Sequence, residues 1–298
     1  MVSLEISKKE IFSLIDLANN FKSENMSEYR QENLFPDKTV ASIFCEPSTR
    51  TKLSFQIAAH NLGARFLDFD LDNSSIQKGE TLEDTIEAMA IMGVDMCVLR
   101  HPESSIHELA KKFTRIQFIN AGEGSVGHPS QALLDLMTIK ESKDKFENLK
   151  IAIVGDIKHS RVARSLAEGF RIMAGKKLAL IAPEEFKPNM EFYPKAEHYK
   201  NLDQGLVNAD VVVALRVQKE RIESLTKTMS PDDYFEKYGL TKKRLQPCNE
   251  DVIVMHPGPV NRGVEISDEV ADGTNSVIRE QVTNGIAIRM ALLSMMQA

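Results

Sequence analysis

Apolar and polar positions follow two alternating patterns along the chain, and these predict strands and helices in turn. Short apolar runs that suit buried strands lie at 40–44, 65–69, 95–99 and 116–119. Between the runs, apolar residues recur every three or four positions, as in Phe55, Ala58, Ala59 and Leu62, which is typical of a helix with one buried face. Strands that alternate with helices at this spacing predict βαβ units and a parallel sheet.

The same alternation begins again after a charge-rich stretch, Lys140 to Lys150, which we interpret as a linker. Further apolar runs that suit buried strands lie at 151–156, 178–182, 211–215 and 252–255. A long helix, apolar on one side, is predicted for about 277–296. The fold class is therefore α/β, with two doubly wound parallel sheets.

Serine residues are predicted to begin several of the helices. Ser7 and Glu10, and Ser105 and Glu108, have the spacing of a capping box, in which each residue bonds the other's backbone N–H. Ser130 is predicted to cap the helix that continues to Ile139. The polar segment 70–79 lacks periodicity and is predicted to be an exposed loop.

Length and charge restrict the class of protein. A chain of 298 residues with 42% apolar content can form two domains of ordinary size. A net charge of -6 argues against a nucleic-acid partner, which requires a basic face. No apolar run approaches the ~18 residues that span a bilayer, and charged residues interrupt the N-terminal segment where a signal peptide needs an apolar core. We therefore expect no membrane association.

The cysteines indicate a reducing compartment. Cys45, Cys97 and Cys248 are odd in number and far apart, so we expect free thiols and not a disulfide framework. No cysteine and histidine residues have the spacing of zinc ligands, and we expect no metal. Gly155-Asp156-Ile157-Lys158 lacks the glycine spacing of a dinucleotide loop, so we expect no nicotinamide or flavin cofactor. A cytoplasmic location fits these features.

The segment Ser48 to Thr51, between the first strand and its helix, has the chemistry of a phosphate site. Backbone N–H groups at a helix N-terminus have no partner within the helix, and the helix dipole favours an anion there. The hydroxyls of Ser48, Thr49 and Thr51 and the guanidinium of Arg50 add donors at the same point. A serine cap followed by a solvated arginine is the simpler interpretation of these residues alone.

Polar residues also follow most of the other predicted strands. In a parallel sheet, ligands bind beyond the carboxyl ends of the strands, so side chains from different loops meet at one edge. Arg161 and Arg216 could each hold one carboxylate of a dicarboxylic substrate, although solvated strand ends are the simpler interpretation of either residue alone. The residues that follow strands in this way include Arg100, His128, Gln131, Arg161, Arg216, Gln218, Pro257 and Gly258.

Ser48-Thr49-Arg50-Thr51 followed by Lys52-Leu53-Ser54-Phe55 resembles the carbamoyl-phosphate loop of the aspartate/ornithine carbamoyltransferase family. The resemblance covers nearly the whole chain, and the later motifs are similar to those of the family members that use aspartate. It implies transfer of the carbamoyl group of carbamoyl phosphate to the α-amino group of L-aspartate, a step of de novo pyrimidine biosynthesis. It also implies a carbamoyl-phosphate-binding domain of residues 1–140 plus 277–298, and an aspartate-binding domain of residues 150–276.

The resemblance implies a role for each motif residue. Arg50, Thr51, Arg100 and His128 would be catalytic. Carbamoyl phosphate would contact Ser48, Thr49, Arg50, Thr51, Arg100, His128, Gln131, Pro257 and Gly258, and L-aspartate would contact Arg161, Arg216 and Gln218. In this family, a serine and a lysine of one loop enter the active site of a neighbouring subunit. Ser74 and Lys78 are the corresponding residues, with Lys78 reaching both substrates, which implies a homotrimer with shared sites.

Two rival functions stay open at this point. A carbamoyltransferase that uses ornithine or a derivative would need an acidic acceptor pocket, whereas Arg216 supplies a cation. Its last strand would be followed by His-Cys-Leu-Pro, whereas this chain has His256-Pro257-Gly258-Pro259. A non-catalytic, two-domain anion-binding protein would need only the Ser48 to Thr51 segment. Association with regulatory or other pyrimidine-pathway chains cannot be read from the motifs.

Overall fold

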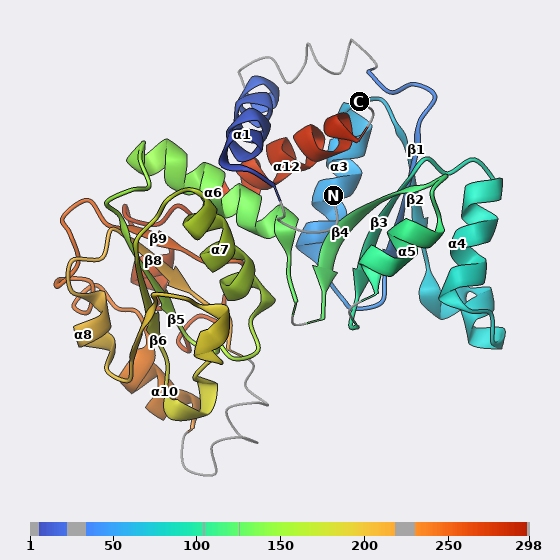
Figure 1. Ribbon diagram of the computed structural model, residues 1–298. Coiled ribbons are helices and arrows are strands. Elements are labelled where there is room, and N and C mark those ends of the chain that lie inside the picture. Colours follow the sequence, from blue (N-terminus) through green and yellow to red (C-terminus); the bar gives the residue numbers. More distant parts are fainter. Residues whose placement is uncertain (1–5, 23–33, 104, 125, 218–229, 297–298) are drawn as a thin grey trace. The chain divides into compact units, whose positions relative to one another are not determined.

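The chain divides into two compact units, of which the first is discontinuous in sequence. The computed structural model describes residues 6–22, 34–103, 105–124, 126–217 and 230–296. Unit 1 comprises residues 1–134 and 283–298, and unit 2 comprises residues 135–282. Each unit contains one parallel sheet flanked by helices (Figure 1). The predicted α/β class with two parallel sheets is confirmed.

Unit 1 is built on four parallel strands in the order β2-β1-β3-β4. The strands are β1 (Thr39–Phe44), β2 (Arg65–Phe69), β3 (Met96–His101) and β4 (Gln117–Glu123). The helices are α1 (Lys8–Lys22), α3 (Thr49–Asn61), α4 (Leu82–Ile91) and α5 (Ile106–Lys112), with short 3-10 turns η1 (Leu71–Asn73) and η2 (Ser75–Lys78). All four predicted strands are present, but β4 continues four residues past the predicted end because Glu123 still pairs with His101.

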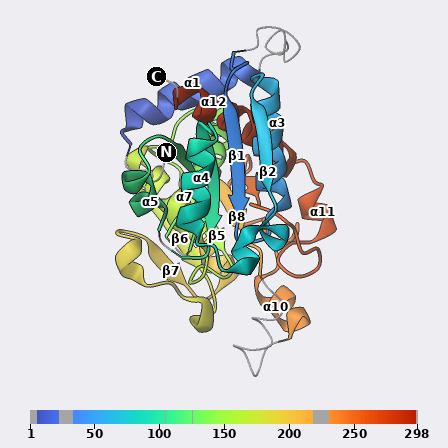
Figure 2. The same cartoon turned by 90° about the vertical axis from the view of Figure 1, so that its right-hand side faces the viewer.

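Alternation along the strands decides which helices cover which face of this sheet. Ala41 and Ile43 of β1 point into one core, which α4 and α5 close with residues such as Ile86 and Ile106. Helix α3 covers the opposite face with residues such as Phe55. Figure 2 shows β1 and β2 side by side with α3 beside them. Helices therefore cover both faces of the sheet, while the edge strand β2 stays largely exposed.

Unit 2 contains five parallel strands in the order β7-β6-β5-β8-β9. The strands are β5 (Lys150–Val154), β6 (Lys177–Ile181), β7 (Glu197–Tyr199), β8 (Val211–Ala214) and β9 (Ile253–Met255). The helices and 3-10 turns are α7 (Arg161–Ile172), η3 (Glu184–Phe186), η4 (Met190–Phe192), α8 (Leu202–Leu206), α10 (Pro231–Tyr238) and α11 (Asp268–Ala271). The sequence patterns predicted β5, β6, β8, β9 and α7 but neither β7 nor α8, α10 and α11.

Two helices, α6 (Pro129–Lys143) and α12 (Ile278–Met295), each contain residues of both units. The C-terminal part of α12 packs in unit 1, where Asn61 Nδ2 donates to Met290 Sδ at 3.8 Å and Arg289 lies 5.1 Å from the centre of the Phe55 ring. The predicted return of the last helix to the first unit is confirmed. The predicted linker at 140–150 is wrong in its first part, because α6 continues to Lys143, whose ammonium lies 2.7 Å from the Asp251 carboxylate.

Asp95 joins the amino ends of β1 and β3. Its carboxylate accepts from the Thr39 N–H at 2.8 Å and from Lys38 Nζ at 2.9 Å. Burial of the carboxyl raises its pKa, but these two donors together outweigh burial and hold the pKa of Asp95 below its ordinary value. A carboxyl whose pKa is lower in the folded state stabilises the fold above its unfolded pKa. That stability is lost as the pH falls through the folded pKa.

We expect Asp95→Asn to lower the unfolding free energy by about 1–3 kcal/mol at neutral pH, because the amide cannot replace a charged acceptor for two donors. The difference from the unsubstituted protein should shrink as the pH falls below about 5, through the unfolded pKa and then through the lower folded pKa of the carboxyl. Denaturant unfolding across this range measures the difference. Asp37→Asn, at an exposed carboxylate two residues before Thr39, is the matched control. A difference for Asp95→Asn that stays constant with pH would contradict this account.

Candidate functional site

The loop after β1 presents the predicted phosphate-binding residues at the start of α3. Helix α3 begins at Thr49, and the Ser48 side chain makes no capping bond within the described part of the chain. Thr49 and Arg50 are exposed, whereas Thr51 is buried in the first turn. The hydroxyl of Ser48, the guanidinium of Arg50 and the unbonded N–H groups of the first turn are thus grouped at one helix end.

Arg100 lies beside this loop because β3 pairs with β1. Phe44 is the register partner of Arg100, and the Cys45 N–H donates to the Arg100 carbonyl at 2.9 Å. The Arg100 guanidinium donates to the Ala121 carbonyl at 3.3 Å, and its Nε lies 3.3 Å from the Glu46 carboxylate. Its side chain is only 14% exposed. The guanidinium is therefore held by both neighbouring strand ends and has little freedom to turn.

His128 and Gln131 follow β4, the neighbour of β3, and both are buried. Helix α6 begins at Pro129, directly after His128, and the N–H of Gln131 donates to the His128 carbonyl at 3.0 Å. The prediction that Ser130 caps this helix is wrong, because Ser130 lies in the first turn and its hydroxyl is 3.4 Å from His128 Nδ1. The ring of His128 is thus contacted by its own helix.

Glu123 is a site-edge residue that the sequence patterns did not reveal. Its buried carboxylate accepts from the Ile106 N–H at 2.7 Å and from Asn120 Nδ2 at 3.0 Å. It therefore caps α5, and the predicted capping box of Ser105 with Glu108 is not formed because the Ser105 side chain makes no cap bond. Glu123 also pairs with Gly127, which closes the loop that leads into His128.

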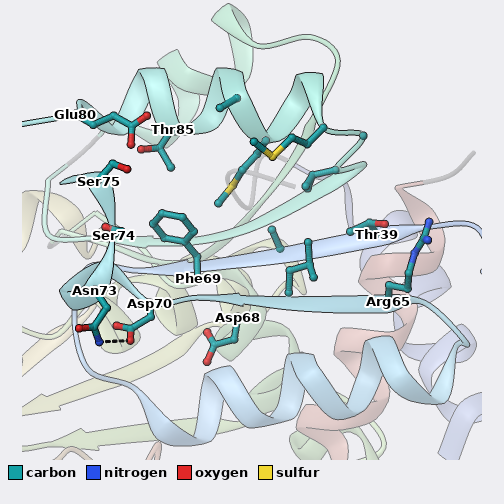
Figure 3. A pocket seen from close by; sticks show the side chains of 17 residues that line it. Thr39, Arg65, Asp68, Phe69, Asp70, Asn73, Ser74, Ser75, Glu80 and Thr85 are labelled. Atoms are coloured by element: carbon teal, nitrogen blue, oxygen red, sulfur yellow. Dashed lines mark hydrogen bonds between the residues drawn. The ribbon is translucent and has the colours of Figure 1, made fainter. Parts of the chain in front are cut away.

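In the segment 70–79, Ser74 lies between the two 3-10 turns and Lys78 is the last residue of the second. Ser74 Oγ donates to the Leu71 carbonyl at 2.8 Å, and Lys78 is exposed at the end of η2. Ser74 lines a cavity of about 780 Å³ between β2, this segment and α4 (Figure 3). The residues that line the cavity include none from 48–51, nor Arg100 or His128. Ser74 and its cavity therefore share no lining residue with the other predicted contacts of unit 1 named here.

Arg161 and Arg216 follow β5 and β8, which are neighbouring strands of unit 2. Arg161 is the first residue of α7, directly after Ser160, whose hydroxyl accepts from the Ala163 N–H at 3.1 Å. Arg161 is half-buried, and Arg216 is exposed two residues beyond Ala214, the end of β8. Both arginines thus lie beyond the carboxyl edge of one sheet. Gln218, the third predicted aspartate contact, lies outside the described residues.

A glycine allows β5 and β8 to end so close together. Gly155 has φ +127, and a Cβ there would lie 3.2 Å from the Leu215 carbonyl oxygen. The next residue, Asp156, is buried and its carboxylate lies 2.8 Å from Nδ1 of His159. The turn that leads to Arg161 is therefore held by a contact between the buried Asp156 and the exposed His159.

Pro257 and Gly258 follow β9, the neighbour of β8, and are half-buried. Gly258 has φ +71 and precedes a cis peptide bond to Pro259. The structure thus brings Arg161, Arg216 and the Pro257–Gly258 segment to one edge of the unit 2 sheet. In unit 1 it brings the Ser48–Thr51 segment, Arg100 and the residues after β4 to one edge of the other sheet.

Cys45, which precedes the Ser48–Thr51 segment, is not an activated nucleophile. Burial, followed by the nearby Glu46 carboxylate, raises the pKa of Cys45, so the thiol stays protonated near neutral pH. All three cysteines are free, and burial raises the pKa of Cys97 to about 12.

Among the described residues, no group of three His, Cys, Asp or Glu side chains has the arrangement of a metal site. No helix of the described chain has the length and apolar content to cross a bilayer.

Comparison with known proteins matches both units to one family. Residues 2–141 match the model of the aspartate/ornithine carbamoyltransferase carbamoyl-P binding domain, and residues 147–296 match that of the family's Asp/Orn binding domain. The aspartate carbamoyltransferase catalytic subunit of Desulfosudis oleivorans is 45% identical over 96% of this chain and 92% of its own length.

Solved structures agree with this assignment. Aspartate transcarbamoylase from Trypanosoma cruzi, in complex with carbamoyl aspartate and phosphate, has a TM-score of 0.84 and 30% identity, over 98% of this chain and 93% of that one. Ornithine carbamoyltransferase from Pyrococcus furiosus has a TM-score of 0.84 and 26% identity, over 97% and 94% of the two chains. With both domain models matched and a relative 45% identical over nearly its full length, this chain belongs to the aspartate/ornithine carbamoyltransferase family.

Proposed function

We propose that the protein is an aspartate carbamoyltransferase, which transfers the carbamoyl group of carbamoyl phosphate to the α-amino group of L-aspartate. The observation that carries the choice of acceptor is the pair Arg161 and Arg216, which follow neighbouring strands at one sheet edge. Two guanidinium groups suit a dicarboxylate, whereas a cationic acceptor such as ornithine would be repelled. The similarity to relatives named aspartate carbamoyltransferase supports the same choice.

Unit 1 is proposed to bind carbamoyl phosphate. Ser48, Thr49, Arg50 and Thr51 hold the phosphate, with the Arg50 guanidinium opposite the charge that grows on the leaving group. Arg100, His128 and Thr51 donate to the carbonyl oxygen, and Gln131 accepts from the carbamoyl NH2 group. The carbonyls of Pro257 and Gly258 are proposed as further acceptors for this NH2 group.

The reaction needs placement and charge stabilisation more than it needs a reactive side chain. The α-amino nitrogen of aspartate forms a bond to the carbamoyl carbon, and the carbonyl electrons move to oxygen. The C–O bond to phosphate then breaks, and the amine's proton leaves with the phosphate. One preorganised donor at the developing oxyanion contributes about 3–4 kcal/mol. The buried His128 and the restrained Arg100 suit this task, because they need little rearrangement during the reaction.

A two-acceptor assay tests the proposed function. Purified protein is given carbamoyl phosphate with L-aspartate or with L-ornithine, and both phosphate release and the carbamoylated product are measured. We expect N-carbamoyl-L-aspartate with the first acceptor and no product with the second. Product with ornithine alone would identify the rival carbamoyltransferase. Saturable binding of carbamoyl phosphate without any transfer would identify an anion-binding protein.

A homotrimer with shared active sites is proposed for the assembly, with Ser74 and Lys78 entering a neighbouring site. The exposed position of Lys78 supports this proposal, as do two apolar side chains at the cavity of Figure 3: Leu67 is 51% and Met92 81% exposed. Apolar groups that face solvent together mark contact surfaces.

A place in de novo pyrimidine biosynthesis follows from the proposed product. A cytoplasmic location follows from the free thiols.

We expect an inactive Lys78→Ala protein and an inactive Arg50→Ala protein to recover activity when they are dissociated together and reassembled. In a three-fold trimer whose sites pair neighbouring chains, each mixed trimer has one intact site. An equal mixture should then regain about a quarter of the full activity. Arg50→Ala mixed with Arg100→Ala is the matched control, because both changes lie in the same half of a site. Recovery in the control, or none in the test mixture, would count against shared sites.

A further inference from the structure

His256 is a buried histidine next to the Pro257–Gly258 segment, and the roles described so far do not involve it. Its side chain has no exposed surface, and each ring nitrogen has one partner. Nδ1 lies 2.8 Å from the Gly258 N–H, and Nε2 lies 3.0 Å from Glu265 Oε1. Its backbone N–H donates to Gln281 Oε1 at 2.9 Å. The ring is therefore fixed from both sides.

These partners determine which ring nitrogen carries the proton. A backbone N–H can only donate, so Nδ1 must accept from Gly258 and must be unprotonated. Nε2 then carries the hydrogen and donates it to the Glu265 carboxylate. Glu265 is itself 2% exposed, and its Oε1 also accepts from the Asn261 N–H at 2.6 Å. The carboxylate thereby selects the tautomer that can hold Gly258.

The bond to Gly258 also sets the direction of the Pro257 carbonyl. The peptide unit that joins Pro257 to Gly258 is trans, so its C=O and N–H point in opposite directions. Because the N–H points at the buried ring of His256, the carbonyl oxygen of Pro257 points away from it. A rotation of this peptide unit would break the hydrogen bond to Nδ1. The ring thus restricts rotation of this peptide unit, and with it the direction of the Pro257 carbonyl.

We propose that His256, in the tautomer selected by Glu265, is a positioning residue that holds the Pro257 carbonyl in the direction needed to accept from the carbamoyl NH2 group. This inference depends on the proposed function, which assigns that contact to Pro257. His256 does not touch the substrate. Its effect on the reaction passes through the peptide unit of Pro257 and Gly258.

Two substitutions at His256 separate positioning from packing. In His256→Asn, the amide oxygen can take the place of Nδ1 and accept from Gly258. In His256→Gln, the amide reaches Glu265 in place of Nε2 but leaves the Gly258 N–H without its acceptor. We expect kcat/KM for carbamoyl phosphate to fall about 10–100-fold in His256→Gln and less than about threefold in His256→Asn, since small misplacements of a contact are costly. The KM for L-aspartate should change little in either variant.

Thermal unfolding of both variants checks the packing alternative. Each variant loses one buried hydrogen bond, so a packing role predicts that activity follows stability, whereas positioning predicts that only His256→Gln loses activity. The same two substitutions at His198, whose ring contacts the Ala182 carbonyl at 3.2 Å, are the matched control. The two His198 variants should have equal activity. Equal activity of His256→Asn and His256→Gln, with the unsubstituted enzyme active, would overturn the inference. An unsubstituted enzyme that transfers no carbamoyl group would instead overturn the proposed function.

Nitrogen NMR tests the tautomer without any substitution. In protein labelled with 13C and 15N, the His256 ring resonances, assigned through their couplings to the backbone of the same residue, should show an unprotonated Nδ1 and a protonated Nε2. A proton on Nδ1 is incompatible with the bond from Gly258 and would overturn the inference even if neither variant folds.

Discussion

Arg50→Ala is expected to lower turnover by at least about 10³-fold, because it removes both the bidentate phosphate contact and the charge opposite the leaving group. Arg50 is exposed at the start of α3 and lies outside the buried core of the described residues, so the fold should be retained. Steady-state phosphate release measures the loss, and circular dichroism with thermal unfolding measures the fold.

Arg115→Ala is the matched control for this substitution. Arg115 is also exposed in unit 1, but it precedes β4 and so lies at the amino edge of the sheet. The control should keep nearly full turnover. If Arg50→Ala kept a tenth or more of the rate of the unsubstituted enzyme, the phosphate site would be misplaced.

Arg216→Ala is expected to raise the KM for L-aspartate by about 100-fold, which corresponds to about 2.7 kcal/mol for a lost charged and bidentate contact. Arg216 lies beyond β8 in unit 2 and is proposed to contact only L-aspartate, whereas the proposed contacts of the phosphate group, Ser48 to Thr51, lie in unit 1. The KM for carbamoyl phosphate should therefore change by less than about threefold. Initial rates with each substrate varied in turn measure the two constants.

Arg171→Ala supplies the comparison for Arg216. Arg171 is another exposed arginine of unit 2, near the C-terminal end of α7 and ten residues from Arg161. Neither KM should change in this control. Equal increases in both KM values for Arg216→Ala would contradict the assignment of Arg216 to L-aspartate alone.

The position of the site was predictable because it depends on local patterns. A buried run, a Ser-Thr-Arg-Thr segment and an amphipathic helix define a strand, a loop and a helix N-terminus within one short stretch of sequence. Parallel pairing then places every strand's carboxyl end at the same edge, which is why Arg100 was expected beside Ser48. In the structure, Phe44 and Arg100 are partners in the register of β1 and β3, as this expectation requires.

The contacts that escaped prediction are those whose partners are distant in sequence. Ser105 has a suitable local partner in Glu108, but the buried Glu123 reaches the same helix end from β4. The charged stretch after Lys140 has the composition of a linker, yet Lys143 pairs with Asp251, a residue 108 positions away. No local periodicity contains such information.

Short polar strands escaped prediction for a different reason. Strand β7, of only three residues, lies at the edge of its sheet and pairs only with β6 among the described strands. Its residues Glu197, His198 and Tyr199 therefore do not need the apolar run that marks a strand buried on both faces.

His256 was visible in the sequence, but its role as a hydrogen-bond acceptor depends on Glu265, nine residues away.

The discontinuity of unit 1 has a consequence for biosynthesis. Residues 283–296 are translated after all of unit 2, yet Met290 and Arg289 contact Asn61 and Phe55 on α3. Until these late residues leave the ribosome, the face of α3 that they cover has no partner from α12. The part of the protein that is made first is therefore completed last, whereas unit 2, which is contiguous, already has all of its residues.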